Sequence, residues 1–181
     1  MTRTEIALLR GINVGKAKRI AMADLRALVE ELGYGDVRTL LNSGNVVFSV
    51  PAKVRGDSAA RIQKAIASEL GVEARVTVVT AQELAVAVDE NPLLDAMTNP
   101  SRFLVAFLNR PADRSLLAPL AKRKWGSERF AVGARVAYLW CPDSILESPL
   151  GTEFGRLMKD AATTRNWATV TKLRTLASSA T

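Results

Sequence analysis

The chain has 181 residues, 48% hydrophobic and 24% charged, as expected of a globular protein with one core or two small ones. It contains no histidine, which excludes Ser-His-Asp and Cys-His nucleophiles, histidine zinc sites and an imidazole acid or base. The single cysteine, Cys141, excludes an intrachain disulfide, and we expect no metal and no cofactor. No apolar run approaches the roughly 20 residues of a membrane span, and the start lacks a signal-peptide core. These features predict a cytoplasmic protein without a membrane partner.

The formal net charge is +7, and it is unevenly distributed along the chain. Residues 1–90 carry 12 basic and 11 acidic side chains, whereas residues 91–181 carry 13 and 7. An anionic partner would therefore be attracted to the second half. A basic surface that only keeps the protein soluble explains the same numbers, so charge alone does not identify a ligand.

The hydrophobic pattern of the first 80 residues predicts strands and helices in the order β-α-β-β-α-β. Buried or alternating apolar residues mark the strands, and apolar stripes of helical period mark the helices. The predicted elements are a strand at 5–11, a helix at 23–32, strands at 37–41 and 46–50, a helix at 58–70 and a strand at 72–79. This order predicts a ferredoxin-like unit at residues 1–80, with two helices over one face of an antiparallel sheet.

The second part of the chain repeats the beginning of this order. A capping box at Thr80–Glu83 predicts a helix to about Asp89, and Asn91-Pro92 ends it. The further predictions are strands at 103–108, 129–132 and 136–140 and helices at 112–122, 152–160 and 167–176. We therefore expect an α+β fold with a second, incomplete ferredoxin-like unit and C-terminal helices at residues 81–181. The two units could also pack as one domain.

Several motifs occur in one order along nearly the whole chain. They are Arg10–Gly15, Met22 with Leu25-Arg26, Asn42–Phe48, Thr80–Leu84, Asn91-Pro92 and Thr164–Leu173. Together they resemble the bacterial family called domain of unknown function 1697 (DUF1697). The resemblance implies an α+β fold of two ferredoxin-like pieces and no assigned activity, substrate or cofactor. The stretch before Ser148 departs from the glycine-rich approach expected of the family, so no role is carried over to Ser148.

The loop after the first strand invites comparison with a phosphate-binding loop. A Walker A motif needs four residues between its glycines and Ser or Thr after its lysine. Here three residues separate Gly11 from Gly15, and Ala17 follows Lys16, so the loop is not a Walker A motif. A looser anion nest is one interpretation, and a plain strand-to-helix crossover is the other. The candidate ligand-binding residues are Arg10, Asn13, Gly15, Lys16 and Lys18.

The turn at residues 42–45 is explained by hairpin chemistry, because Asn and Gly accept a positive φ. The predicted topology places this turn and the end of the first strand at opposite ends of the sheet. We therefore expect the two turns not to form one site unless the loop at 11–22 folds back.

The beginning of the last predicted helix is a second place for an anion. Asn166 is the expected N-cap, and Arg165 lies beside helix amides whose dipole favours negative charge. Lys172 follows on the same helix. Trp167 starts an apolar stripe and is interpreted as a core residue.

A separate basic run, Lys122-Arg123-Lys124-Trp125, combines cations with an aromatic ring, as single-stranded nucleic acid sites do. Cations in a last helical turn also stabilise the helix dipole, which is the structural explanation. No paired carboxylates have catalytic or metal-binding spacing.

The sequence assigns no function and leaves it open whether the protein is an enzyme. The preferred hypothesis is a non-catalytic module that binds an anion, either a nucleotide or RNA. One alternative is a small-molecule enzyme that polarises an anionic substrate with arginine and lysine. The other is a protein-interaction module that uses exposed sheet edges. The oligomeric state is not predicted.

Overall fold

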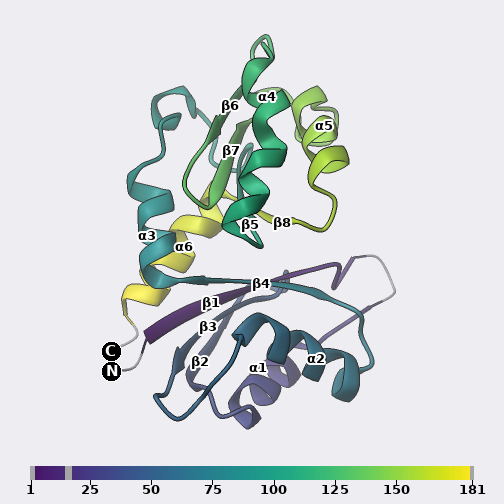
Figure 1. The fold of residues 1–181 in the computed structure, drawn as a ribbon, viewed down its shortest axis with the longest axis vertical. Coiled ribbons are helices and arrows are strands. Elements are labelled where there is room, and N and C mark those ends of the chain that lie inside the picture. The colour runs from purple at the N-terminus through teal and green to yellow at the C-terminus, as the bar shows by residue number, and fades with distance from the viewer. Residues whose placement is uncertain (1–2, 15–17, 180–181) are drawn as a thin grey trace. The chain divides into compact units, whose positions relative to one another are not determined.

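The computed structural model describes residues 3–14 and 18–179 of the chain. It divides into two compact units: one comprises Met1–Gln82 with Leu173–Thr181, and the other comprises Glu83–Lys172. Each unit contains a four-stranded antiparallel sheet packed with helices, so the α+β prediction of two ferredoxin-like units is confirmed (Figure 1). Within the described part of the chain, no helix is long and apolar enough to cross a membrane.

The first unit has the predicted element order. Its elements are β1 (Arg3–Arg10), α1 (Met22–Glu31), β2 (Gly35–Leu40), β3 (Asn45–Val50), α2 (Ser58–Leu70) and β4 (Arg75–Thr80). The strand order in the sheet is β2-β3-β1-β4. The central strand β1 is antiparallel to both of its neighbours, β3 and β4.

Both faces of β1 are buried. Residues Ile6 to Leu9 are at most 1% exposed, as predicted for an apolar run without polar alternation. Ala7 and Leu9 pack in one cluster with Leu25 of α1 and Ile62 of α2. Figure 1 shows these two helices covering the same face of the sheet.

The second unit repeats this topology. It contains most of α3 (Ala81–Asp89), a short 3-10 helix η1 (Leu94–Ala96), β5 (Phe103–Leu108), the 3-10 helix η2 (Pro111–Leu117), α4 (Ala118–Lys122), β6 (Arg129–Val132), β7 (Val136–Trp140), α5 (Pro149–Met158) and β8 (Ala162–Asn166). The strand order is β6-β7-β5-β8. The last helix, α6 (Trp167–Ser178), follows β8 directly.

Strand β8 was not predicted from the sequence, which indicated only three strands in this unit. Its residues are Ala-Thr-Thr-Arg-Asn, a short polar run without the apolar alternation that marks a half-buried strand. Pairing with β5 along Leu104–Leu108 decides its conformation. This strand gives the second sheet the same four-stranded arrangement as the first.

Two helices of the second unit differ from their predictions. The single helix expected at 112–122 is instead η2 followed by α4, and Pro119 explains the change because it has no N–H to donate to a carbonyl four residues earlier. Helix α5 begins at Pro149, three residues before its predicted start. Ser148 caps it, and proline at the first helical position is typical of a helix start.

Candidate functional site

The two glycine- and asparagine-rich turns lie at the same end of the first sheet, not at opposite ends as predicted. Strands β1 and β3 are antiparallel, and Leu8 near the end of β1 pairs with Asn45 at the start of β3. The β2–β3 hairpin therefore adjoins the loop that follows β1. We call this region the loop end, defined by residues 10–14, 18–20 and 41–44.

The side chain of Asn13 joins the two turns. Its Nδ2 donates to the carbonyl oxygen of Asn42 at 2.7 Å and to that of Ile20 at 3.1 Å. Its Oδ1 accepts from the backbone N–H of Ile20 at 2.9 Å, and its own N–H donates to the Lys18 carbonyl at 3.0 Å. Both amide hydrogens of Asn13 are thus used within the protein. Asn13 fixes the loop rather than offering a donor to a ligand.

The two turns approach each other closely at Gly44. Its N–Cα torsion φ is +79°, and a Cβ placed on it would lie 2.7 Å from Leu9 Cβ and 2.7 Å from Ile12 Cδ1. Its carbonyl accepts from the N–H of Leu9 at 2.8 Å. Asn45, which is fully buried, donates to the Leu40 carbonyl at 2.8 Å and holds the hairpin closed. Several motif residues therefore have structural roles.

Exposed cations surround the joined turns. Arg10, Lys18, Arg19 and Arg75 are all exposed. Arg10 and Arg75 are direct cross-strand partners on β1 and β4, so their side chains leave the same face of the sheet. Gly15 and Lys16, the other predicted ligand-binding residues of this loop, lie outside the described residues.

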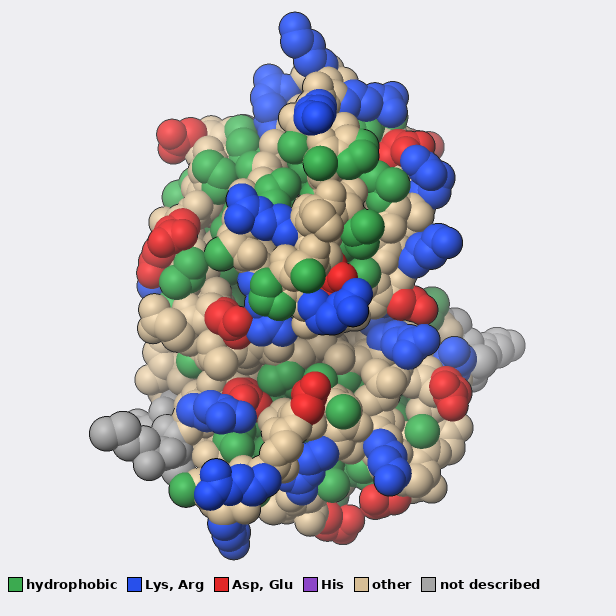
Figure 2. Space-filling view, viewed as in Figure 1, with side chains coloured by type: hydrophobic (Ala, Val, Ile, Leu, Met, Phe, Trp, Pro, Cys, Tyr) green, Lys and Arg blue, Asp and Glu red, His purple; other side chains and the backbone are tan. Residues whose placement is uncertain are grey.

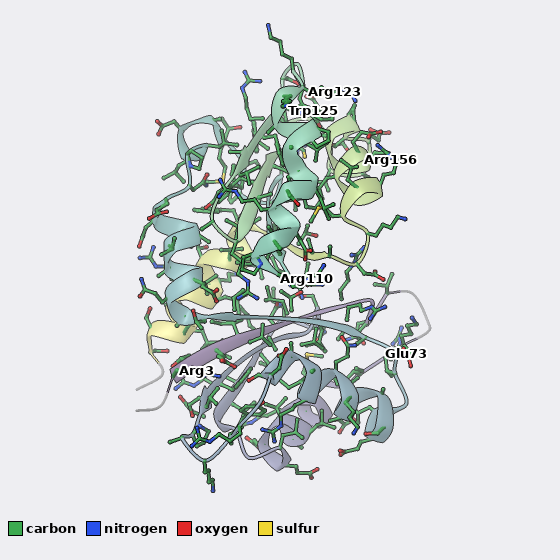
Figure 3. The ribbon with its side chains drawn as sticks, viewed as in Figure 1. Arg3, Glu73, Arg110, Arg123, Trp125 and Arg156 are labelled. Atoms are coloured by element: carbon green, nitrogen blue, oxygen red, sulfur yellow. The ribbon has the colours of Figure 1, made fainter. Side chains whose placement is uncertain are left out.

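The same end carries a few acidic groups and the start of a helix. Glu73, which precedes β4, is exposed at this end, as Figure 3 shows, and Asp24 is exposed in the first turn of α1. The N-cap of α1, Ala21, makes no side-chain capping hydrogen bond. The first amides of α1 consequently have no side-chain acceptor at their cap.

The predicted residues at the start of α6 belong to the second unit. Asn166 is the N-cap, as predicted: its Oδ1 accepts from the N–H of Thr169 at 2.9 Å. The N–H of Trp167 donates to the Pro100 carbonyl at 3.1 Å, so the first turn has acceptors within the protein. Arg165 donates to the Thr164 carbonyl at 2.8 Å, and burial lowers its pKa to about 10. Its guanidinium remains charged at neutral pH, and Lys172 is exposed further along the helix.

The basic run at 122–125 lies where α4 ends. The guanidinium carbon of Arg123 is 4.4 Å from the centre of the Trp125 ring, and Trp125 Nε1 donates to the Leu120 carbonyl at 3.0 Å. Figure 3 shows these two side chains together, and Figure 2 shows lysine and arginine side chains gathered around this end of the unit. Because Trp125 also packs against the core, its ring is largely engaged and is a poor platform for stacking a base.

A buried carboxylate, Glu128, was not identified from the sequence. It accepts a hydrogen bond from the Ser148 hydroxyl and another from the N–H of Leu150 at 3.0 Å. Ser148 Oγ in turn accepts from the N–H of Gly151 at 2.8 Å. Burial raises the pKa of the nearby Cys141 thiol. Glu128 and Ser148 are buried and fix the start of α5. In the sequence, only the Ser148-Pro149 pair could have indicated this helix start in advance.

The described residues include no group of three or more histidine, cysteine or acidic side chains that could hold a metal ion. The charged side chains within the loop end, those of Arg10, Lys18 and Arg19, are all cationic and exposed.

Comparison with known proteins identifies a similar structure and the family of this chain. The conserved bacterial protein SP0830 from Streptococcus pneumoniae has a similar structure, with a TM-score of 0.79 and 18% sequence identity over 98% of this chain and 99% of that one. At this identity the similarity shows the fold alone. No curated protein matches the sequence. The model of the family described as protein of unknown function (DUF1697) matches residues 1–138, and the chain therefore belongs to this family.

Proposed function

We propose that the protein binds an anionic ligand, a nucleotide or a nucleic acid strand, at the loop end of the first unit, without catalysing a reaction. The observation that carries this proposal is the clamp made by Asn13. It holds two segments about 30 residues apart in sequence at one end of the sheet, where Arg10, Lys18, Arg19 and Arg75 are exposed.

These cations suit phosphate groups for two reasons. Arginine presents a planar fork of N–H donors that can bind two phosphate oxygens at once, and lysine adds a compact positive charge. The uncapped start of α1 supplies backbone amides at the same end. The exposed carboxylates of Glu73 and Asp24 only partly offset this charge.

Binding without catalysis fits the surrounding side chains better than an enzyme does. A general acid or base is a positioned side chain, such as a carboxylate, lysine or tyrosine, whose pKa is tuned by burial and by its neighbours. The acidic residues at the same end of the sheet, Asp24 and Glu73, are both exposed. Both tyrosines of the chain are buried: Tyr34 follows α1, and Tyr138 belongs to the second unit.

The test is binding of a fluorescein-labelled 12-nucleotide single-stranded RNA and of a labelled ATP analogue, measured by fluorescence anisotropy from 50 to 300 mM KCl. We expect affinity to fall steeply with salt. The double variant Arg10→Glu/Lys18→Glu should bind more weakly, and its salt slope should be smaller by about 0.7 for each phosphate that the variant no longer neutralises.

The matched control is Lys53→Glu/Arg55→Glu, which makes the same change in net charge. Both residues are exposed and follow β3, whose last residue, Val50, pairs with Arg3 at the far end of β1. We expect this control to retain most of the affinity. Salt-independent binding, equal losses in the two variants, or loss only in Lys122→Glu/Lys124→Glu would refute the assignment to the loop end.

A further inference from the structure

Two large apolar side chains are exposed at the loop end, beside its cations. Val14 is 76% exposed and Leu41 is 51% exposed. They adjoin Asn13 and Asn42, the two residues that the 2.7 Å hydrogen bond connects. Each of the two turns therefore carries an exposed apolar side chain next to a residue of this hydrogen bond.

The backbone at Leu41 makes its identity unusual. Its φ is +58°, in the left-handed region that glycine and asparagine adopt readily and leucine rarely does. Because the side chain is half exposed, burial in the first unit does not fully compensate for this conformation. A residue held in an unfavourable conformation at a surface suggests a role in binding.

We infer that the ligand of the loop end is a single-stranded nucleic acid. The protein would bind its phosphates and would contact the apolar faces of its bases and riboses. The inference rests on the proposed function, because Arg10 and Lys18 would hold the phosphates. Val14 and Leu41 would then contact the unstacked bases or riboses, which single strands expose and duplexes keep stacked. Inorganic polyphosphate offers the same charge without an apolar face.

The variant that tests this inference is Leu41→Asn. Asparagine accepts the left-handed conformation, so the substitution should preserve or improve folding while it removes the apolar contact. The probes are a labelled 12-nucleotide oligouridylate and inorganic polyphosphate of 12 units, the latter used as a competitor. We expect the variant to bind the RNA about fivefold to tenfold more weakly and polyphosphate unchanged.

The matched control is Leu146→Asn, a change of the same kind at a leucine that is 93% exposed in the second unit. It should alter neither affinity. If Leu41→Asn leaves RNA binding unchanged, or if polyphosphate competes as well as RNA itself, the inference fails, while the Arg10→Glu/Lys18→Glu result still decides the proposed function. If neither these probes nor the labelled ATP analogue binds the native protein, both proposals fail.

Discussion

Replacing Gly44 by alanine tests whether the close contact of the two turns stabilises the first unit. The added Cβ would lie 2.7 Å from Leu9 Cβ, an atom next to the backbone that no rotamer change can move away. The second close atom, Ile12 Cδ1, ends a flexible side chain and can shift. The substitution therefore forces the hairpin and β1 apart, or strains both.

Gly11→Ala is the matched control for this experiment. Gly11 has a φ of +81°, close to the +79° of Gly44, but nothing lies within 4 Å of its added Cβ. Both variants place a Cβ on a residue with positive φ, which costs about 1 kcal/mol. Only Gly44→Ala adds overpacking of about 1–3 kcal/mol, so its total should reach about 2–4 kcal/mol.

Urea denaturation followed by far-ultraviolet circular dichroism measures this difference. With a slope of about 2 kcal/mol per molar urea, Gly44→Ala should lower the midpoint by about 1–2 M and Gly11→Ala by about 0.5 M. The three tryptophans, Trp125, Trp140 and Trp167, all lie in the second unit, so their fluorescence follows that unit separately. Equal shifts in the two variants would refute the argument that space at Gly44 is required.

Two further predictions concern the second unit. The variant Glu128→Ala should lower the free energy of unfolding by about 2–4 kcal/mol, because it leaves two buried donors at the start of α5 without an acceptor. Its control is Glu147→Ala, on the adjacent exposed loop. In the same urea experiment this control should change the free energy of unfolding by less than about 0.5 kcal/mol. Burial, with a smaller effect of the Glu90 charge, raises the pKa of Tyr138 to about 12. The folded state therefore favours the neutral phenol, and this contribution to stability, complete below pH 10, should be lost as the pH rises towards 12. The urea midpoint should fall over this range by more in the native protein than in Tyr138→Phe, and equal falls would contradict the assignment.

The sequence predicted the elements whose apolar pattern is strong. Every strand and helix of the first unit appeared where the periodicity indicated it, with ends displaced by at most a few residues. Strand β8 was missed because its polar residues have no such pattern, and its conformation depends on pairing with β5. Local propensity carries no information about a partner that lies about 60 residues away in sequence.

The positions of the candidate residues were predicted in part, and their binding of a ligand stays a prediction. Arg10, Asn13 and Lys18 do lie together, but the predicted topology placed the second turn at the other end of the sheet. The error came from the direction of β3: an antiparallel strand beside β1 must begin where β1 ends. The clamp at Asn13 could not be derived from composition, because its acceptors are backbone carbonyls whose positions only the fold determines.

The structure separates the residues in and beside the two turns into two chemical groups. Asn13, Gly44 and Asn45 direct their hydrogen bonds and their close contacts at the chain itself, so they account for how the loop end is built. Arg10 and the apolar residues Val14 and Leu41 are exposed on that framework and are accessible to a ligand. A substitution in the first group should therefore reduce stability and binding together, whereas a substitution in the second should reduce binding alone. That separation makes Leu41→Asn more informative about function than any change at the glycines and asparagines that first draw attention in the sequence.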